Sequence, residues 1–202
     1  MEKELSQMTR EELWKLFPII LKDHNTVYKN WYEEEKEAII NNLGEKGLIR
    51  INHIGSTAVE GLLAKPTVDI LLEIDKKCDI FKLIDPIKAM GWLLMQEQYD
   101  PEPHLAFNKG YTARGFAQKV YHLHVRYFGD WGELYFRDYL REYSQVALEY
   151  GELKQRFKKQ YEYNRDAYTE AKTEFVSKYT ELAREYYKDK YKVIDDMKRE
   201  QR

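Results

Sequence analysis

The sequence predicts an α+β fold for this chain of 202 residues. Residues 1 to about 47 carry apolar side chains at helical spacing, and a helix is expected over 26–43 with Gly44 as its stop. Residues 48 to about 127 contain runs typical of strands, and residues 130 to 190 are helical again. We therefore expect a sheet flanked by helices, followed by a C-terminal helical part.

The individual elements follow from the same patterns. Strands are expected over 48–54, 67–74, 92–98, 104–109 and 119–128, with a helix over 79–90 between the second and the third. Helical patterns cover 132–157 and 165–187. We divide the chain into an N-terminal helical extension (1–19), one domain (20–190) and a polar tail (191–202).

The N-terminal extension carries signals for the start and the end of a helix. Thr9 and Glu12 have the spacing of a capping box, in which each residue satisfies a free backbone N–H group of the other. Pro18 is expected to break or restart the helix, because it cannot donate a hydrogen bond to the preceding turn.

Composition limits the class of partner. Charged residues make up 34% of the chain but nearly cancel, to a net charge of −2. Nonspecific nucleic-acid binding needs a surplus of positive charge, so nucleic acid is not an expected partner. The single cysteine, Cys78, excludes an intramolecular disulfide and a cysteine-based zinc finger. The sequence has no apolar run of membrane-spanning length and no signal-peptide core, so we expect a cytoplasmic protein without membrane contact.

Two predicted strands combine an apolar face with a face that collects titratable groups. In the strand at 67–74, Asp69 lies opposite a wholly apolar set; at 120–127, His122, His124 and Arg126 share one face. If the strands share a sheet, these groups converge. Asp69, His122 and His124 are then candidate ligands of a divalent metal (Mg²⁺, Mn²⁺ or Zn²⁺). The alternative is the solvated side of an antiparallel sheet.

A turn at Gly55 and Ser56 precedes the first of these strands. Gly55 lets a ligand approach the backbone closely, and Ser56 and Thr57 could open a short helix over 57–62. Free N–H groups and two hydroxyl groups there suit an anion such as phosphate, and Lys65 adds a nearby cation. Helix capping without any ligand is the alternative for the same residues.

Several blocks of the sequence resemble a known family. The segments HIGSTAVEGLLAKPTVDI, HLHV, FRDYLREYSQVALEYGELK and YTEAKTEF are similar, in order and spacing, to blocks of the GrpB family over roughly residues 20 to 187. The resemblance implies a polymerase-β-type nucleotidyltransferase fold, with a mixed sheet flanked by helices. It also implies a nucleotide or other phosphorylated small molecule as the ligand. Members of the family also occur fused to dephospho-CoA kinases.

One departure from the implied active-site pattern bears on catalysis. The resemblance implies a Gly-Ser turn followed by two acids on the next strand, and Gly55, Ser56 and Asp69 match the first three positions. Leu71 stands where the second acid is expected. Glu73 lies about 13 Å from Asp69 at ~3.3 Å per residue, whereas two catalytic metals lie about 3.5–4 Å apart. A standard two-magnesium reaction is therefore not expected.

Cationic residues in the later blocks are candidates for phosphate binding. Arg137 and Arg141 lie one turn apart on a predicted helix, and guanidinium groups bind phosphate in bidentate fashion. A surface ion pair of Glu133 with Arg137 is the alternative. Lys154 and Lys172 match positions of the family blocks, and Lys172 is the better candidate of the two.

The sequence leaves two functions open. The first is an enzyme that transfers a nucleotidyl group: the Gly-Ser turn holds the phosphates, Asp69 is the catalytic metal-binding acid, and Arg137 or Lys172 neutralises charge. The second is a binding module for a nucleotide or phosphate that has lost catalysis. The missing second acid favours the module, and the surviving titratable face favours the enzyme.

Overall fold

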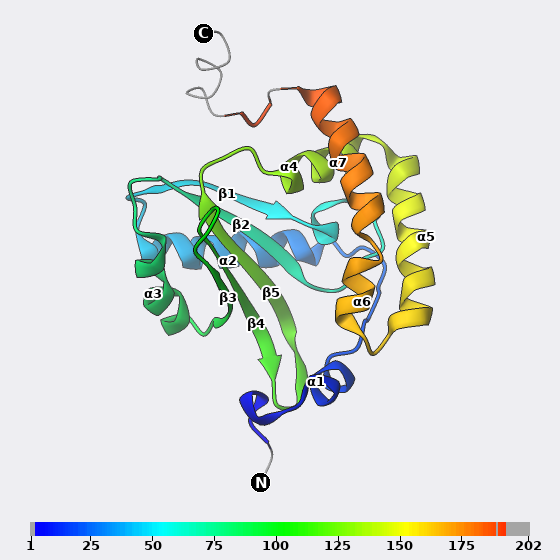
Figure 1. Ribbon diagram of the computed structural model, residues 1–202, viewed down its shortest axis with the longest axis horizontal. Helices are drawn as coiled ribbons and strands as arrows, with labels where there is room; N and C mark the ends of the chain where they lie inside the picture. The colour runs from blue at the N-terminus through cyan, green and yellow to red at the C-terminus, as the bar shows by residue number, and fades with distance from the viewer. Residues whose placement is uncertain (1–2, 189, 193–202) are drawn as a thin grey trace.

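The computed structural model describes residues 3–188 and 190–192. Its centre is one five-stranded sheet in the order β1-β2-β5-β4-β3. The strands are β1 (Leu48–Ile54), β2 (Val68–Ile74), β3 (Leu93–Gln98), β4 (His104–Thr112) and β5 (Gly115–Tyr127). The β2–β5 pair is parallel and the other three pairs are antiparallel, so the sheet is mixed, as Figure 1 shows.

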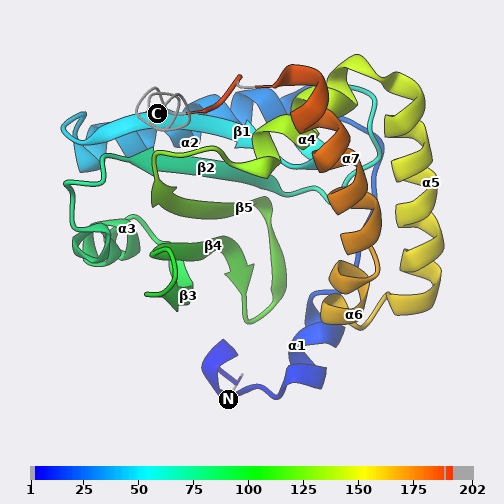
Figure 2. The same cartoon turned by 45° about the horizontal axis from the view of Figure 1, so that its top comes forward.

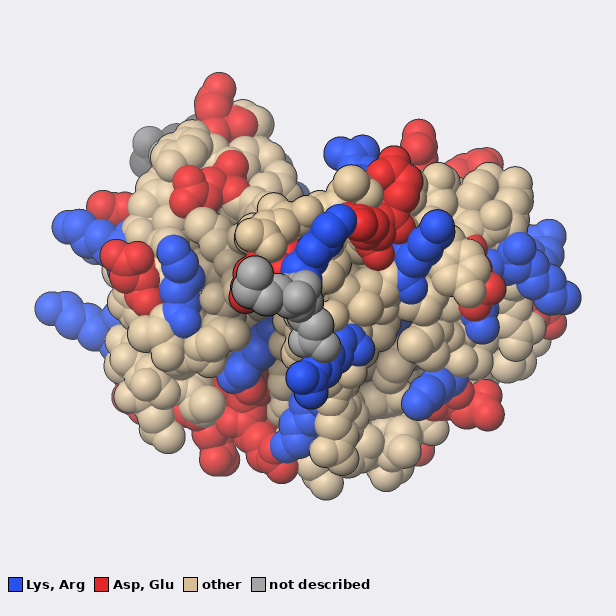
Figure 3. All heavy atoms as spheres, turned by 90° about the horizontal axis from the view of Figure 1, so that it is seen from below, with Lys and Arg blue, Asp and Glu red and all other residues tan. Residues whose placement is uncertain are grey.

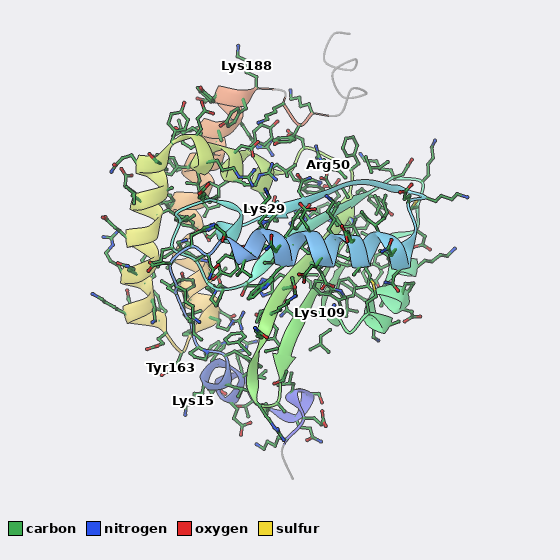
Figure 4. All side chains as sticks on the ribbon, turned by 180° about the vertical axis from the view of Figure 1, so that it is seen from behind. Lys15, Lys29, Arg50, Lys109, Tyr163 and Lys188 are labelled. Atoms are coloured by element: carbon green, nitrogen blue, oxygen red, sulfur yellow. The ribbon has the colours of Figure 1, made fainter. Side chains whose placement is uncertain are left out.

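Helices cover both faces of the sheet. They are α1 (Arg10–Leu16), α2 (Val27–Leu43), α3 (Ile84–Ala89), α4 (Gly132–Glu142), α5 (Ser144–Tyr161), α6 (Arg165–Glu170) and α7 (Thr173–Tyr187). Seen from behind, α2 crosses the strands (Figure 4). Figures 1 and 2 show α5, α6 and α7 together at one end of the sheet, with α4 beside β1. The predicted α+β class, with a mixed sheet flanked by helices and a helical C-terminal part, is confirmed.

The largest core lies between the sheet and α2 with α3. The apolar set of β2 enters it together with alternate residues of β5, namely Val68, Ile70, Leu72, Ile74, Tyr121, Leu123 and Val125. On the opposite face Leu71 packs with Ile54 and Leu134, under α4. The predicted division of each strand into two side-chain sets therefore holds, but both faces are covered. The solvated antiparallel alternative is wrong, because the titratable set lies on a parallel pair beneath helices.

Each of the two long helical stretches is divided. The first breaks at Tyr143, whose ψ of 81° is not helical, so α4 ends at Glu142 and α5 starts at Ser144. The second breaks between Glu170 and Thr173. These breaks allow α5, α6 and α7 to pack against one another, and the cluster of Leu140, Ala147, Tyr150, Phe175 and Val176 joins them to α4.

The N-terminal extension packs against the β4–β5 hairpin. Its capping box is present: Glu12 N donates to Thr9 Oγ1 at 3.2 Å, and Thr9 N donates to Glu12 Oε2 at 2.8 Å. The helix ends before Pro18 and does not restart until Val27. No helix in the described part of the chain combines the length and apolar character needed to cross a bilayer. Most of the predicted tail (193–202) lies outside the described residues.

A buried ion pair joins β1 to β2. Arg50 donates to both carboxylate oxygens of Glu73, at 2.5 and 2.6 Å, and to the carbonyl oxygen of Gly129 at 2.9 Å. The Glu73 side chain has no exposed surface. This acid is therefore held by its own cation and is not free to act with Asp69.

Removing the cation of this pair should destabilise the fold strongly. We expect Arg50→Ala to lower the free energy of unfolding by ~3–5 kcal/mol, because it leaves the buried Glu73 carboxylate without a partner. The measurement is urea unfolding at pH 7. Lys36→Ala, which breaks the exposed pair with Glu33, is the control and should cost less than ~1 kcal/mol. Equal losses in the two variants would contradict the assignment.

Candidate functional site

The site is organised by the in-register pairing of β2 with β5, which sets Asp69 beside His122. His122 Nδ1 lies 2.8 Å from Asp69 Oδ1. The other ring nitrogen, Nε2, lies 2.8 Å from the hydroxyl of Tyr111, which in turn accepts a hydrogen bond from Arg165 Nη2 at 2.9 Å. These three bonds share one consistent direction: Arg165 donates to Tyr111, Tyr111 to His122, and His122 to Asp69. The direction requires only a neutral imidazole and an ionised carboxylate.

The Asp69 carboxylate is held ionised. Burial raises its pKa, but the hydrogen bond from His122 and the charges of His122, His124 and Lys65 outweigh burial and lower that pKa below its ordinary value. The position of this carboxylate also explains why residue 55 is a glycine. Gly55 has a φ of 70°, and a Cβ at this position would collide with Asp69 Oδ2. The glycine thus lets the turn lie directly on the acid.

The turn after Gly55 is shorter than the sequence suggested. Ser56–Ala58 forms a single 3₁₀ turn and not a helix over 57–62. A helix dipole therefore does not contribute here. A side chain supplies the positive charge: Lys154 Nζ, on the buried side of α5, donates to Ser56 Oγ at 3.0 Å and to the carbonyl oxygen of Leu63. It also lies 4.5 Å from the centre of the Tyr150 ring.

A cavity of about 510 Å³ opens between this turn, the sheet and helices α4 to α7; we call it the Asp69 pocket. The residues predicted for the site that line it are Gly55, Ser56, Asp69, His124, Arg137 and Lys172. They come from five elements or turns of the chain and meet in one hollow. The volume is within the range of small-molecule sites.

Cations lie near the Asp69 carboxylate of this pocket, whose other acidic lining residue, Glu133, is paired with Arg126. Burial lowers the pKa of Lys172 to about 8, although the charge of Asp69 opposes the shift. Burial, with repulsion from Lys172 and Lys65, also lowers the pKa of Lys154 well below its usual range. In the described part of the chain, the Lys172 ammonium contacts the Tyr168 ring at 4.5 Å but has no hydrogen-bond or ion-pair partner. Lys172 thus lines the pocket with the Asp69 charge partly offsetting its own, and without a direct ion pair among the described residues.

Other predicted residues lie at the edge of this pocket or outside it. Arg137 is buried, and its guanidinium donates to Asp138, Asn52, His53 and Tyr191 at 2.8–3.1 Å. Its surface pair with Glu133 is absent, because Glu133 pairs with Arg126 at 2.8 Å. Arg137 is therefore placed to brace the pocket wall, with its donors already used.

Arg141, Thr57 and Lys65 face away from the Asp69 pocket. Arg141 donates to the carbonyl oxygen of Ala58 and, with Thr57, lines a separate hollow near Tyr32. The hydroxyl of Thr57 is buried, donates to the carbonyl oxygen of Thr67 and accepts from His53 Nε2, each at 2.9 Å. His53 thus fixes the turn through its side chain. Lys65 lines another cavity, which is described below as the Trp31 cavity.

Metal binding by Asp69, His122 and His124 stays a prediction, and the geometry of these residues bears on it. Among the described residues, no group of three or more His, Cys, Asp and Glu side chains is placed to hold a metal ion. Both ring nitrogens of His122 are engaged, so it cannot join Asp69 and His124 as a ligand in this arrangement. His124 lines the pocket, and burial lowers its pKa despite the Asp69 charge, so the imidazole is neutral at pH 7.

The sequence did not indicate two residues of the site, Tyr111 and Arg165, and it ranked a third, Lys154, too low. Lys154 was ranked below Lys172, yet it is the lysine that contacts Ser56; its position on the apolar stripe of α5, beside Ala147 and Tyr150, is the signal that marks it as buried. Tyr111 and Arg165 were not singled out. They meet His122 only because the hairpin and α6 converge, which no local pattern encodes.

The fold and the site define an α+β protein with a basic pocket enclosed between a mixed sheet and C-terminal helices. The GrpB protein family model matches residues 18–182, and the chain belongs to the GrpB family. The glutamate-rich protein GrpB of Alkalihalophilus pseudofirmus is 32% identical over 163 residues, which cover 78% of this chain and 91% of that protein. The crystal structure of GrpB from Enterococcus faecalis has a TM-score of 0.72 at 27% identity, over 83% of this chain and 99% of that one.

A UPF0157 protein of Pseudomonas aeruginosa is 36% identical over 148 residues, or 73% of this chain. The match spans 60% of that relative's length. The predicted membership of the GrpB family is therefore confirmed.

The unpaired lysine predicts a gain in stability on substitution. We expect Lys172→Met to raise the melting temperature at pH 7 by ~2–4 °C, the shift that ~1 kcal/mol gives in a chain of this size. The folded-state pKa of Lys172 is about 8 against an ordinary 10.5, so its charge destabilises the fold fully below pH 8. The gain should fade as the pH rises toward 10.5. Calorimetric melting at pH 7 and 10 tests this, and a loss of stability at pH 7 would contradict it.

Proposed function

We propose that the Asp69 pocket binds a phosphorylated small molecule, such as a nucleoside triphosphate. The observation that carries the proposal is the position of Lys154 and Lys172 near a Gly-Ser turn, where neither has an ion-pair partner among the described residues. Buried lysines with lowered pKa values are costly without an anion, and a polyphosphate would supply one. The hydroxyl of Ser56 would add a hydrogen bond. The pocket thus has the charge, the donors and the size for the ligand class that the family resemblance implies.

The charge distribution supports a small ligand and not a nucleic-acid strand. On the face that Figure 3 shows, acidic and basic side chains are interspersed. A tract of DNA or RNA would need a continuous basic surface, because most contacts go to the phosphate backbone.

The donor set fits a magnesium ion brought in with the phosphates. Asp69 offers a carboxylate, and Mg²⁺ is commonly held by one or two carboxylates plus substrate phosphates. A zinc site of three protein ligands does not fit, because His122 is engaged on both ring nitrogens. When bound, the ion would neutralise phosphate charge; Asp69 would hold it, and His122 would orient Asp69.

Nucleotidyl transfer is a second candidate, favoured by the neutral His124 in the same pocket. In this reaction an acceptor hydroxyl oxygen forms a bond to the α-phosphorus while the bond to the oxygen that bridges to the β-phosphorus breaks. Pyrophosphate leaves with the electron pair, and His124 takes the hydroxyl proton. Lys172 and Lys154 would stabilise the leaving charge. The missing acid at Leu71 leaves binding without turnover as the better-supported function.

Calorimetric titration with ATP, with and without Mg²⁺, tests the proposal. We expect Lys154→Gln to weaken ATP binding at least tenfold, because it removes both the charge and the donor at Ser56. Lys159→Gln, on the exposed side of the same helix, is the control and should bind as the unchanged protein does. ATP binding that is absent, or equal in both variants, would refute the pocket. Release of pyrophosphate that requires Mg²⁺ and is lost in Asp69→Ala would establish transfer.

Binding should also depend on pH. Lys172 loses its proton above pH about 8 in the free protein, and a bound phosphate would favour the charged form. We therefore expect ATP affinity to fall between pH 7.5 and 9.5, by at most about tenfold per pH unit for each proton taken up. The charge of ATP itself changes little in this window, since terminal phosphates titrate near pH ~6. Titrations in buffers of different ionisation enthalpy measure the proton uptake, which Lys172→Gln should reduce. A pH-independent affinity would contradict a role for Lys172.

A further inference from the structure

A second cavity lies on the other side of the Asp69–His122 pair. It has a volume of about 470 Å³ and is enclosed by residues 18–20, α2, the segment before β2 and the β4–β5 hairpin. We call it the Trp31 cavity. In the described chain, it has no lining residue in common with the Asp69 pocket. It is therefore a separate space.

Four aromatic side chains, from α2 and from the β4–β5 hairpin, line the Trp31 cavity. Trp31 and Tyr28 come from α2 and contact each other edge to face at 5.6 Å. Tyr111 and Phe116 come from the hairpin, and the buried ring of Phe17 packs on both, at 4.9 and 5.0 Å. Rings held in this way offer faces and edges to a planar ligand at little entropic cost.

The charge of this cavity has one sign. Lys22, Lys65 and Arg165 line it, and no acidic side chain of the described residues does. Burial, with repulsion from Arg165 and Lys172, lowers the pKa of Lys65 to about 7. Arg165 donates one N–H to Tyr111, and its remaining donors have no partner among the described residues. A guanidinium with free donors beside aromatic rings suits a carboxylate, sulfonate or phosphate group.

We propose that the Trp31 cavity is a second ligand site, which takes a small organic anion with a planar ring. The rings of Trp31 and Phe116 contact the planar part, and Arg165 and Lys65 bind the anionic group. The hydrogen bonds from Arg165 through Tyr111 and His122 to Asp69 connect this site to the first pocket. The role of this cavity as the site of an acceptor substrate rests on the transfer reaction proposed above. Binding of the anion in the cavity does not depend on that reaction.

Calorimetric titration of the full chain with naphthalene-2-sulfonate tests the site, with the uncharged naphthalene-2-methanol as the matched probe. We expect the sulfonate to bind at least tenfold more tightly than the alcohol. Gln118→Glu places an acid at the exposed edge of the cavity and should weaken sulfonate binding at least fivefold. Gln160→Glu, exposed on α5, makes the same change of net charge far from the cavity and should have less than a twofold effect.

A second pair of variants removes positive charge. Arg165→Gln should weaken the sulfonate at least tenfold, and Arg156→Gln, an exposed arginine on α5, should not. The inference is overturned if each cavity variant binds the sulfonate as tightly as its control variant does. It is also overturned if the unchanged protein binds the sulfonate and the alcohol equally tightly. Displacement of the sulfonate by saturating ATP overturns it too, since the two cavities would then be one site. If ATP does not bind but the sulfonate binds with this pattern, the proposed function fails and the second site stands.

Discussion

The parallel pairing of β2 with β5 is the constraint on which the site depends. Successive side chains of a strand point to opposite faces of the sheet. The register that pairs Asp69 with His122 therefore places both side chains on the face below α4 and α7. A slip by one residue would turn the acid into the large core with α2 and bring an apolar side chain to the pocket. The register is fixed from the other face, where buried Val68, Ile70 and Leu72 interlock with Leu123 and Val125. Packing on one side of the sheet thus determines the chemistry on the other.

The stability of that core makes the buried lysines possible. Burial disfavours the charge of Lys154 and of Lys172, and repulsion from Lys172 and Lys65 adds to this effect at Lys154. In a less stable fold such groups would lie in solvent or pair with acids. This chain uses such a pair at Arg50 and Glu73. Here the nearest acid, Asp69, is already satisfied by His122. Charge left without a partner in a packed region is typical of a site built for a ligand.

The sequence predicted what depends on local pattern and missed what depends on convergence. Alternation placed Asp69, His122 and His124 on one face, because period two follows from strand geometry alone. Alternation could not show that the second ring nitrogen of His122 would bond to Tyr111. That contact requires β4 to fold back along β5 in the hairpin. In the same way, the sequence favoured Lys172 over Lys154. Only the packing of α5 against the turn at Leu62 and Leu63 brings Lys154 to Ser56.

The missing second acid is a property of the core and not an isolated change in the site. Leu71 is fully buried and packs with Ile54 and Leu134, so α4 rests on it. A carboxylate at this position would lie against the apolar side chains of Ile54 and Leu134, where burial disfavours its charge. The next acid along the strand, Glu73, is neutralised by Arg50. In the proposed function, Asp69, oriented by His122, would therefore be the carboxylate that the pocket offers to a metal ion, and phosphate oxygens would supply further ligands.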